Sequence, residues 1–163
     1  MAAAGNDGPS HIATPCDTDS ILCVGATDVD NNIANFSSVG PASDGRIKPD
    51  VSSIGKGAMC IYSNGNVGSC DGTSFASPVT CGMVACLIQA NPTSTMLEIV
   101  NSVKQSAHQY SSPDNSLGYG IPNACAADSI LHYIGSVKVE EHPFNKKNRT
   151  EFVFCFLSKI FYF

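Results

Sequence analysis

The sequence contains no tryptophan and few charged residues, since charged side chains make up 14% of its 163 residues. Nine lysines and arginines stand against fourteen aspartates and glutamates, which gives a formal net charge of -5. This balance provides no electrostatic attraction for a phosphate backbone, so nucleic acid is not an expected partner. The hydrophobic share of 43% is ordinary for a globular protein and excludes a disordered or fibrous chain.

Long apolar runs are also expected to be absent. No segment approaches the roughly 20 apolar residues that a helix needs to span a bilayer, so no membrane partner is expected. Residues 1–8 have no charged region followed by a long apolar run, and they therefore do not have the pattern of a signal peptide.

Closely spaced cysteine pairs of the C-x-x-C kind are absent, which argues against a zinc site. Two other pairs among the eight cysteines lie close enough in sequence to close loops: Cys16 with Cys23, and Cys60 with Cys70. Cys81 and Cys86 fall in an apolar helical stretch, where a free cysteine packs as a small buried hydrophobe. The oxygen-rich run at 28–32 is typical of a solvated turn, so no metal and no cofactor are expected.

Short apolar segments separated by turns predict an α/β domain. Residues 21–26 form a continuous apolar run, which is typical of a strand buried on both faces of a parallel sheet. An Asn-Gly pair at 64–65 indicates a hairpin. Strands are predicted at residues 2–4, 21–26, 50–53, 59–62 and 67–70, and residues 33–37 are a candidate for a short edge strand.

Three helices are expected. Residues 74–90 are almost uniformly small or apolar, which predicts a helix buried on most sides. Residues 93–108 carry apolar side chains on one face, and Thr93 or Ser94 is available as a cap. A third helix is predicted at 124–133. Beyond that point the chain becomes charged and then Phe-rich, so we place a boundary between a domain at 1–135 and a tail at 136–163.

Residues 72–78, which read Gly-Thr-Ser-Phe-Ala-Ser-Pro, contain the most informative motif. They put the Ser74 hydroxyl where a glycine turn becomes an apolar helix. The backbone N–H of Ser74 then lies at the positive end of the helix, where it can stabilise a negative tetrahedral intermediate. Taken alone, the motif also fits a serine that only caps the helix.

Residues 2–8, Ala-Ala-Ala-Gly-Asn-Asp-Gly, contain the second motif. The Asn6 amide offers an uncharged N–H donor for an oxygen that becomes negative during acyl transfer. The alternative is an ordinary turn with Asn or Asp in the left-handed conformation.

Together the two motifs resemble the subtilase family of serine proteases, with its Gly-Thr-Ser nucleophile motif and its Ala-Ala-Gly-Asn oxyanion block. Three further segments at 20–26, 46–51 and 117–120 resemble family blocks in the same order. The resemblance covers about residues 2–133. One departure is Ser-Ile-Gly at 53–55, where the family usually has Ala-Pro-Gly.

The resemblance implies a subtilisin-like parallel sheet flanked by helices, as a partial domain that lacks its N-terminal portion. It also implies peptide-bond hydrolysis through an acyl-enzyme, a polypeptide substrate, and a secreted or cell-envelope location. By the same resemblance Ser74 is the nucleophile and Asn6 the side-chain oxyanion donor. The substrate-binding residues that it implies are Ala3, Ala4, Gly5 and Thr73.

Subtilases place their catalytic Asp first, His second and Ser last. Among the four histidines only His11 precedes Ser74, and no His-Gly-Thr-His motif surrounds it. A serine hydroxyl without a base is a weak nucleophile, so the chain alone is expected to be inactive and to need the missing N-terminal half as a partner. Four side chains are expected beyond hydrogen-bond reach of Ser74: His11, His108, His132 and His142.

Two alternatives remain open. One is a non-catalytic subtilase-like module that binds peptides or a partner chain. The other is a gene fragment or frameshifted product that does not fold alone, for which the Phe-rich residues 152–163 would be an out-of-frame or truncated end.

Overall fold

A three-stranded parallel sheet forms the centre of the computed structural model, which describes residues 1–140. Its strands are β1 (Ala2–Ala3), β2 (Cys23–Thr27) and β3 (Val51–Ile54), in the order β1-β2-β3. All five residues of β2 are buried, as the continuous apolar run predicts for a central parallel strand. The predicted α/β class is therefore confirmed, with a small parallel sheet of three strands within residues 1–140.

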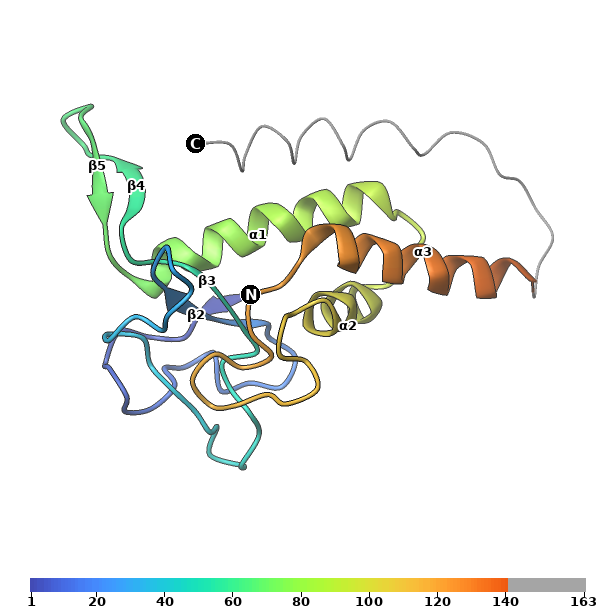
Figure 1. Cartoon of the computed structure of the whole chain (residues 1–163), viewed down its shortest axis with the longest axis horizontal. Coiled ribbons are helices and arrows are strands. Elements are labelled where there is room, and N and C mark those ends of the chain that lie inside the picture. The colour runs from blue at the N-terminus through green and yellow to red at the C-terminus, as the bar shows by residue number, and fades with distance from the viewer. Residues whose placement is uncertain (141–163) are drawn as a thin grey trace.

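A separate antiparallel hairpin follows, formed by β4 (Ala58–Ile61) and β5 (Val67–Cys70). It projects from the body beside the start of the first helix (Figure 1). Both cysteine pairs that lie close in sequence form disulfides: Cys60–Cys70 joins the two strands of this hairpin, and Cys16–Cys23 closes a loop before β2. Residues 33–37 form no strand, since Ile33 makes only an isolated bridge to Thr27.

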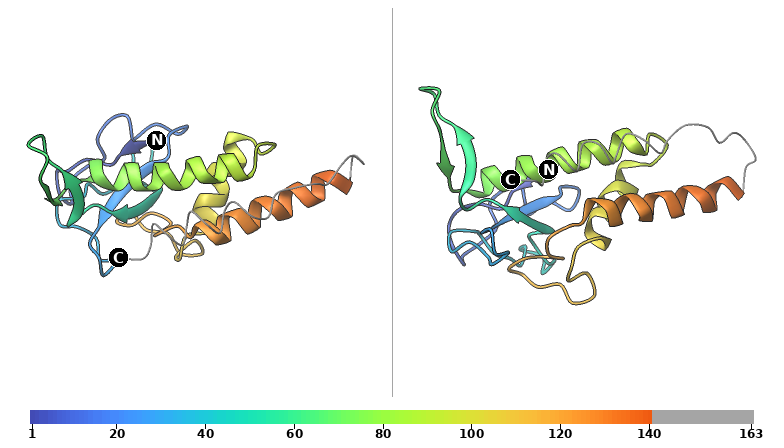
Figure 2. Two further views of the ribbon diagram at one scale, coloured as in Figure 1. Left: turned by 90° about the horizontal axis from the view of Figure 1, so that it is seen from above. Right: turned by 45° about the horizontal axis from the view of Figure 1, so that its top comes forward.

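Helix α1 (Thr73–Ala90) was predicted within one residue, but its predicted burial is wrong. Of its 18 residues only Thr73, Ala76, Thr80 and Leu87 are buried, and Cys81 is exposed. These buried positions follow the helical period along one face, which packs on β2 and β3. Within residues 1–140 no further layer covers the opposite apolar face, as the two views of Figure 2 show.

By length and composition α1 also contradicts the expectation that no segment is apolar enough to cross a membrane. Its 18 residues have a mean hydropathy of 1.3, and 22% of them are buried. A central helix of a globular domain passes the same test. Its first turn is bonded to the end of β1 through Thr73 and Asn6, which favours a domain helix.

The remaining helices are α2 (Met96–Gln105) and α3 (Ala124–Glu140). Helix α2 begins with a capping box in which Thr95, rather than the predicted Thr93 or Ser94, bonds to Glu98. Helix α3 runs alongside α1 (Figure 1) and continues past position 135, so the boundary placed there stays a prediction.

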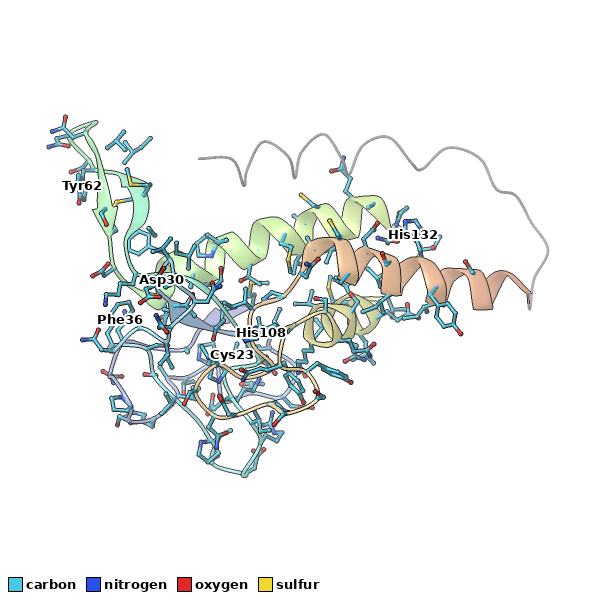
Figure 3. All side chains as sticks on the ribbon, viewed as in Figure 1. Cys23, Asp30, Phe36, Tyr62, His108 and His132 are labelled. Atoms are coloured by element: carbon cyan, nitrogen blue, oxygen red, sulfur yellow. A yellow bond between two sulfur atoms is a disulfide. The ribbon has the colours of Figure 1, made fainter. Side chains whose placement is uncertain are left out.

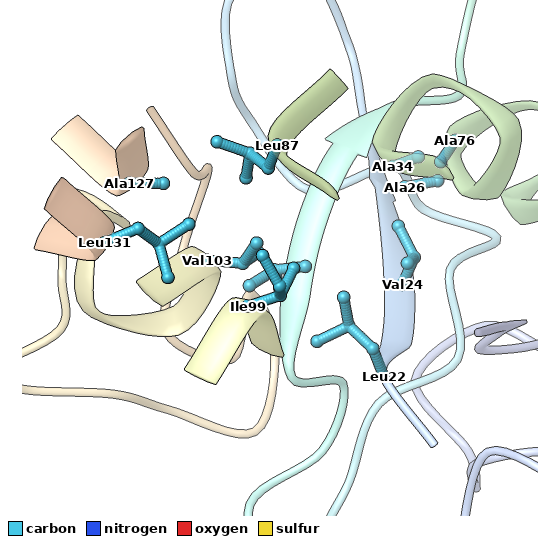
Figure 4. Close-up of a cluster of buried hydrophobic side chains, with 11 residues drawn as sticks. Leu22, Val24, Ala26, Ala34, Ala76, Leu87, Ile99, Val103, Ala127 and Leu131 are labelled. Carbon is cyan, nitrogen blue, oxygen red and sulfur yellow. The ribbon is translucent and has the colours of Figure 1, made fainter. Parts of the chain in front are cut away.

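One apolar core joins the sheet to all three helices (Figure 4). It includes Val24 of β2, Leu87 of α1, Ile99 of α2 and Leu131 of α3. A second, smaller cluster lies under β1. Its members are Ala4, Ile12, Cys16 and Cys23, with Ala2 packed against them.

Candidate active site

The start of α1 carries the Ser74 hydroxyl. Gly72 is the N-cap, with φ of 153° and no side-chain cap bond, and Ser74 is the second residue of the helix. The alternative of a capping serine is therefore wrong. A Cβ on Gly55 would lie 2.7 Å from the carbonyl oxygen of Gly72, so glycine at 55 lets the helix start approach the end of β3 closely.

Asn6 lies at the carboxyl end of β1, beside this helix start. Its side-chain oxygen Oδ1 accepts hydrogen bonds from the Thr73 N–H and from the Thr73 hydroxyl, both at 2.9 Å. The Thr73 hydroxyl in turn accepts the Gly5 N–H at 3.3 Å. Asn6 does not have positive φ, whereas Gly5 and Gly8 do, so the left-handed residues of this turn are its glycines.

These bonds leave the Asn6 amide NH₂ as the end of the side chain that faces away from Thr73. A Cβ built on Gly72 would lie 3.6 Å from this nitrogen, so the NH₂ is close to the loop that leads into Ser74. Asn6 and Ser74 are both exposed to solvent, while Thr73 has 1% of its surface exposed. The structure thus brings an exposed hydroxyl and an exposed amide donor to one edge of the sheet.

The residues predicted to contact substrate divide into two groups. Ala3 and Gly5 are half-buried, on or just after β1. The side chain of Ala4 is 0% exposed and belongs to the small cluster under β1, and Thr73 is turned towards Asn6. Ala4 and Thr73 thus present almost no side-chain surface to a ligand.

The described histidines bond to other groups. His11 Nδ1 is 2.9 Å from the Ser10 hydroxyl, and His108 Nδ1 accepts the Ile121 N–H at 2.9 Å. His132 lies 3.3 Å from Asp128 on α3. Figure 3 shows His108 and His132 well away from the start of α1.

Within residues 1–140 no hydrogen bond reaches the Ser74 hydroxyl, as predicted for His11, His108 and His132. His142 lies outside the described residues. Residues 1–140 thus bring an exposed serine hydroxyl and an exposed amide NH₂ close together, with no histidine hydrogen-bonded to the hydroxyl.

Sequence reasoning missed the residues that support Asn6. Ser38 donates its N–H to the Gly5 carbonyl at 3.0 Å, and its hydroxyl accepts the Asp7 N–H at 3.2 Å. Ala13 donates its N–H to the Ala4 carbonyl at 2.8 Å. These contacts join residues that are not neighbours in the sequence, so no local sequence pattern predicts them.

The oxygen-rich turn at 28–32 uses its own carboxylate. Asp28 Oδ1 accepts the N–H groups of Asp30 and Asn32, at 3.0 and 2.9 Å. Within residues 1–140 no three His, Cys, Asp or Glu side chains gather as ligands for a metal.

Comparison with protein families gives a match over residues 1–120 to the model described as the subtilase family, Peptidase S8. The chain is 37% identical over 115 residues to subtilisin-like protease SBT6.1 of Arabidopsis thaliana, covering 64% of this chain and 11% of that protein. It is 35% identical over 127 residues to subtilisin BL of Lederbergia lenta, covering 78% and 45%. The chain therefore spans less than half the length of these relatives.

Solved structures give the same result. The self-cleaved protease domain of PatA superposes with a TM-score of 0.69 at 26% identity, over 82% of this chain and 49% of that one. The prenylagaramide maturation protease PagA does so with a TM-score of 0.66 at 28% identity, over 80% and 49%.

Proposed function

Because the chain belongs to the subtilase family of serine proteases, we propose that it carries the nucleophile and the oxyanion donors of a serine endopeptidase. The observation that carries this proposal is the junction of Asn6, Thr73 and Ser74 at one edge of the sheet. Ligands of parallel α/β sheets bind at the carboxyl ends of the strands, where this junction lies.

In the proposed reaction the Ser74 hydroxyl attacks the carbonyl carbon of a peptide bond. Its proton goes to a base, and the carbonyl oxygen becomes an oxyanion. The Asn6 amide and the Ser74 N–H donate to this oxyanion. Both Asn6 Oδ1 bonds to Thr73 fix the orientation of the amide before substrate arrives, so little reorganisation is needed in the transition state.

Thr73 therefore acts through Asn6 in this proposal rather than as a direct substrate contact. Half-buried Ala3 and Gly5 line the path of the substrate in this proposal. Ala4 helps to hold both residues in place, because its side chain packs in the small cluster with Ile12 and the two cysteines.

The base and its orienting carboxylate belong, in this proposal, to a preceding half-domain. The face of α1 that nothing within residues 1–140 covers supports this arrangement, since an uncharged helix face is stable when another layer covers it. We call this chain, preceded by a subtilase half-domain with its Asp and His motifs, the extended protein.

A non-catalytic binding module is the second candidate. The observation that favours it is the lack of a hydrogen-bonded base at Ser74 within residues 1–140. Under this alternative the extended protein binds polypeptide at the same edge without cleaving it.

Hydrolysis of an unfolded protein by the extended protein separates the two candidates. We expect cleavage that Ser74→Ala abolishes, and no cleavage by the present chain. Asn6→Ala is expected to lower kcat by about 10²–10³, a magnitude measured for loss of this donor in subtilisin, a member of the same family. Cleavage that survives Ser74→Ala would contradict the proposal, and binding without cleavage would favour the module.

A further inference from the structure

The segment between β1 and β2 has no helix or strand, yet it supports the Asn6 turn. It spans residues 4–22, and Asn6 lies near its beginning. A long irregular segment of this kind orders itself poorly unless particular contacts restrain it. The contacts that restrain it therefore decide how well Asn6 is held.

The Cys16–Cys23 disulfide is the covalent restraint within this segment. Both cysteines are 0% exposed, and they belong to the small cluster with Ala4 and Ile12 under β1. Cys23 is the first residue of β2 and pairs with Ala2 of β1. Cys16 Sγ lies 3.4 Å from the Ala2 carbonyl oxygen, so the disulfide packs directly against β1.

A short path of backbone bonds leads from this disulfide to Asn6. Cys16 donates its N–H to the Ala13 carbonyl at 2.9 Å, and Ala13 donates its own N–H to the Ala4 carbonyl at 2.8 Å. A Cβ on Gly5 would lie 3.0 Å from the Ala13 Cβ, so Ala13 also packs against the residue next to Asn6. The disulfide thus fixes Ala13, and Ala13 fixes the strand end that carries the amide.

We infer that Cys16 and Cys23 are positioning residues, whose disulfide holds the Ala4–Asn6 strand end in register for oxyanion binding. The inference rests on the proposed function for the role of Asn6, while its structural part can be measured without catalysis. Loss of the disulfide releases the Ala13 bond and lets the strand end leave its place, although the main core stays intact.

Arg46 offers a matched control, because it restrains the same segment between Cys16 and Cys23, inside the loop that the disulfide closes. It donates to the Asp17 carbonyl at 2.9 Å and to Asp19 at 3.2 Å. Its hydrogen bond to Asp44 also lowers the pKa of that carboxyl. Arg46→Gln therefore loosens residues 17–19 without touching the path from Cys16 to Asn6.

Amide hydrogen exchange on the full chain tests the inference. The variants are Cys16→Ala with Cys23→Ala, chosen because both sites are fully buried, and Arg46→Gln. We expect the Ala4, Ala13 and Thr73 amides to exchange at least about tenfold faster without the disulfide. The Ser52 amide, bonded to Gly120 at 3.0 Å in the main sheet region, is expected to stay within about twofold.

Several results would overturn the inference. Equally accelerated exchange of the Ser52 amide would mean that the disulfide only stabilises the whole fold. Unchanged exchange rates of the Ala4 and Ala13 amides would mean that the disulfide does not restrain this strand end. If Arg46→Gln accelerated exchange of the Ala4, Ala13 and Thr73 amides equally, any loosening of residues 4–22 would have this effect, and the disulfide would have no particular role. Should the double variant not fold, the Cys60→Ala, Cys70→Ala chain compared before and after reduction gives the same readout, since Cys16–Cys23 is then the one disulfide left within residues 1–140. Because exchange needs no catalysis, failure of Ser74 to react would leave these outcomes unchanged.

Discussion

At the scale of single residues, Asn6 is fixed at its oxygen and open at its nitrogen. Thr73 provides both donors to Oδ1, one from its backbone and one from its hydroxyl. The sequence predicts which residues meet here, because Ala-Gly-Asn and Gly-Thr-Ser resemble the oxyanion and nucleophile motifs of the family. It assigned Thr73 to substrate contact, because a pattern of residue types does not reveal the direction of a side chain that is 1% exposed.

Replacing Thr73 by valine tests this role. Valine keeps the shape and the backbone N–H but removes the hydroxyl that bonds Asn6 and accepts the Gly5 N–H. We expect the kcat of the extended protein to fall by about tenfold or more with little change in KM, because the lost bond orients a transition-state donor. Thr73→Ser is the control and should keep most of the activity. A rise in KM at constant kcat would instead indicate that Thr73 contacts substrate.

At the scale of elements, periodicity and turn chemistry predict the strands, the hairpin and α1 well. The burial of α1 could not be predicted, since an apolar sequence indicates that a helix tends to be covered but does not indicate which other elements are present to cover it. The cap of α2 was misplaced because Thr93, Ser94 and Thr95 are chemically alike, and only the bond to Glu98 distinguishes Thr95. The support of Asn6 by Ser38 and Ala13 is set by tertiary packing alone.

A buried charge cluster joins several elements. Asp50, before β3, binds Lys48 Nζ at 2.6 Å, Lys104 Nζ of α2 at 2.6 Å and the Cys23 N–H of β2 at 2.7 Å. Lys48 and Asp50 side chains are 2% and 3% exposed. Two ammonium groups here depend on one carboxylate, and removing one member of a buried pair leaves an uncompensated charge.

Asp50→Ala is therefore expected to lower the free energy of unfolding by about 3–5 kcal/mol, measured by urea denaturation. Lys104→Gln is the milder comparison, since the Lys104 side chain is 24% exposed and Lys48 still neutralises Asp50. A loss below about 1 kcal/mol for Asp50→Ala would show that the cluster contributes like an exposed ion pair.

At the scale of the whole molecule, the most evident feature is the face of α1 that no other part of residues 1–140 covers. Ile88 is 40% exposed, and Cys81, seven residues before it, lies on the same exposed side of the helix. Val79, which is 43% exposed, lies on the other flank of the buried face. Apolar surface of this extent is normally covered by a further layer of a domain.

The rate of thiol labelling at Cys81 measures whether another layer covers this face of α1. Cys81 is exposed on α1, and Cys125 is exposed at the start of α3. We expect maleimide to modify both in the present chain and Cys81 at least about tenfold more slowly in the extended protein, because a buried thiol is reached only through opening. Equal Cys81 rates in the two proteins would contradict docking of the preceding half-domain on this face.

The most direct test of the central claim is the reaction of Ser74 with a fluorophosphonate probe. Phosphonylation needs a hydroxyl activated by a neighbouring base, which the described residues of this chain do not bring to Ser74. The account predicts labelling at Ser74 in the extended protein, its loss in Ser74→Ala, and no measurable labelling of the present chain. Rapid labelling of Ser74 in the present chain, or none in a folded extended protein, would contradict it.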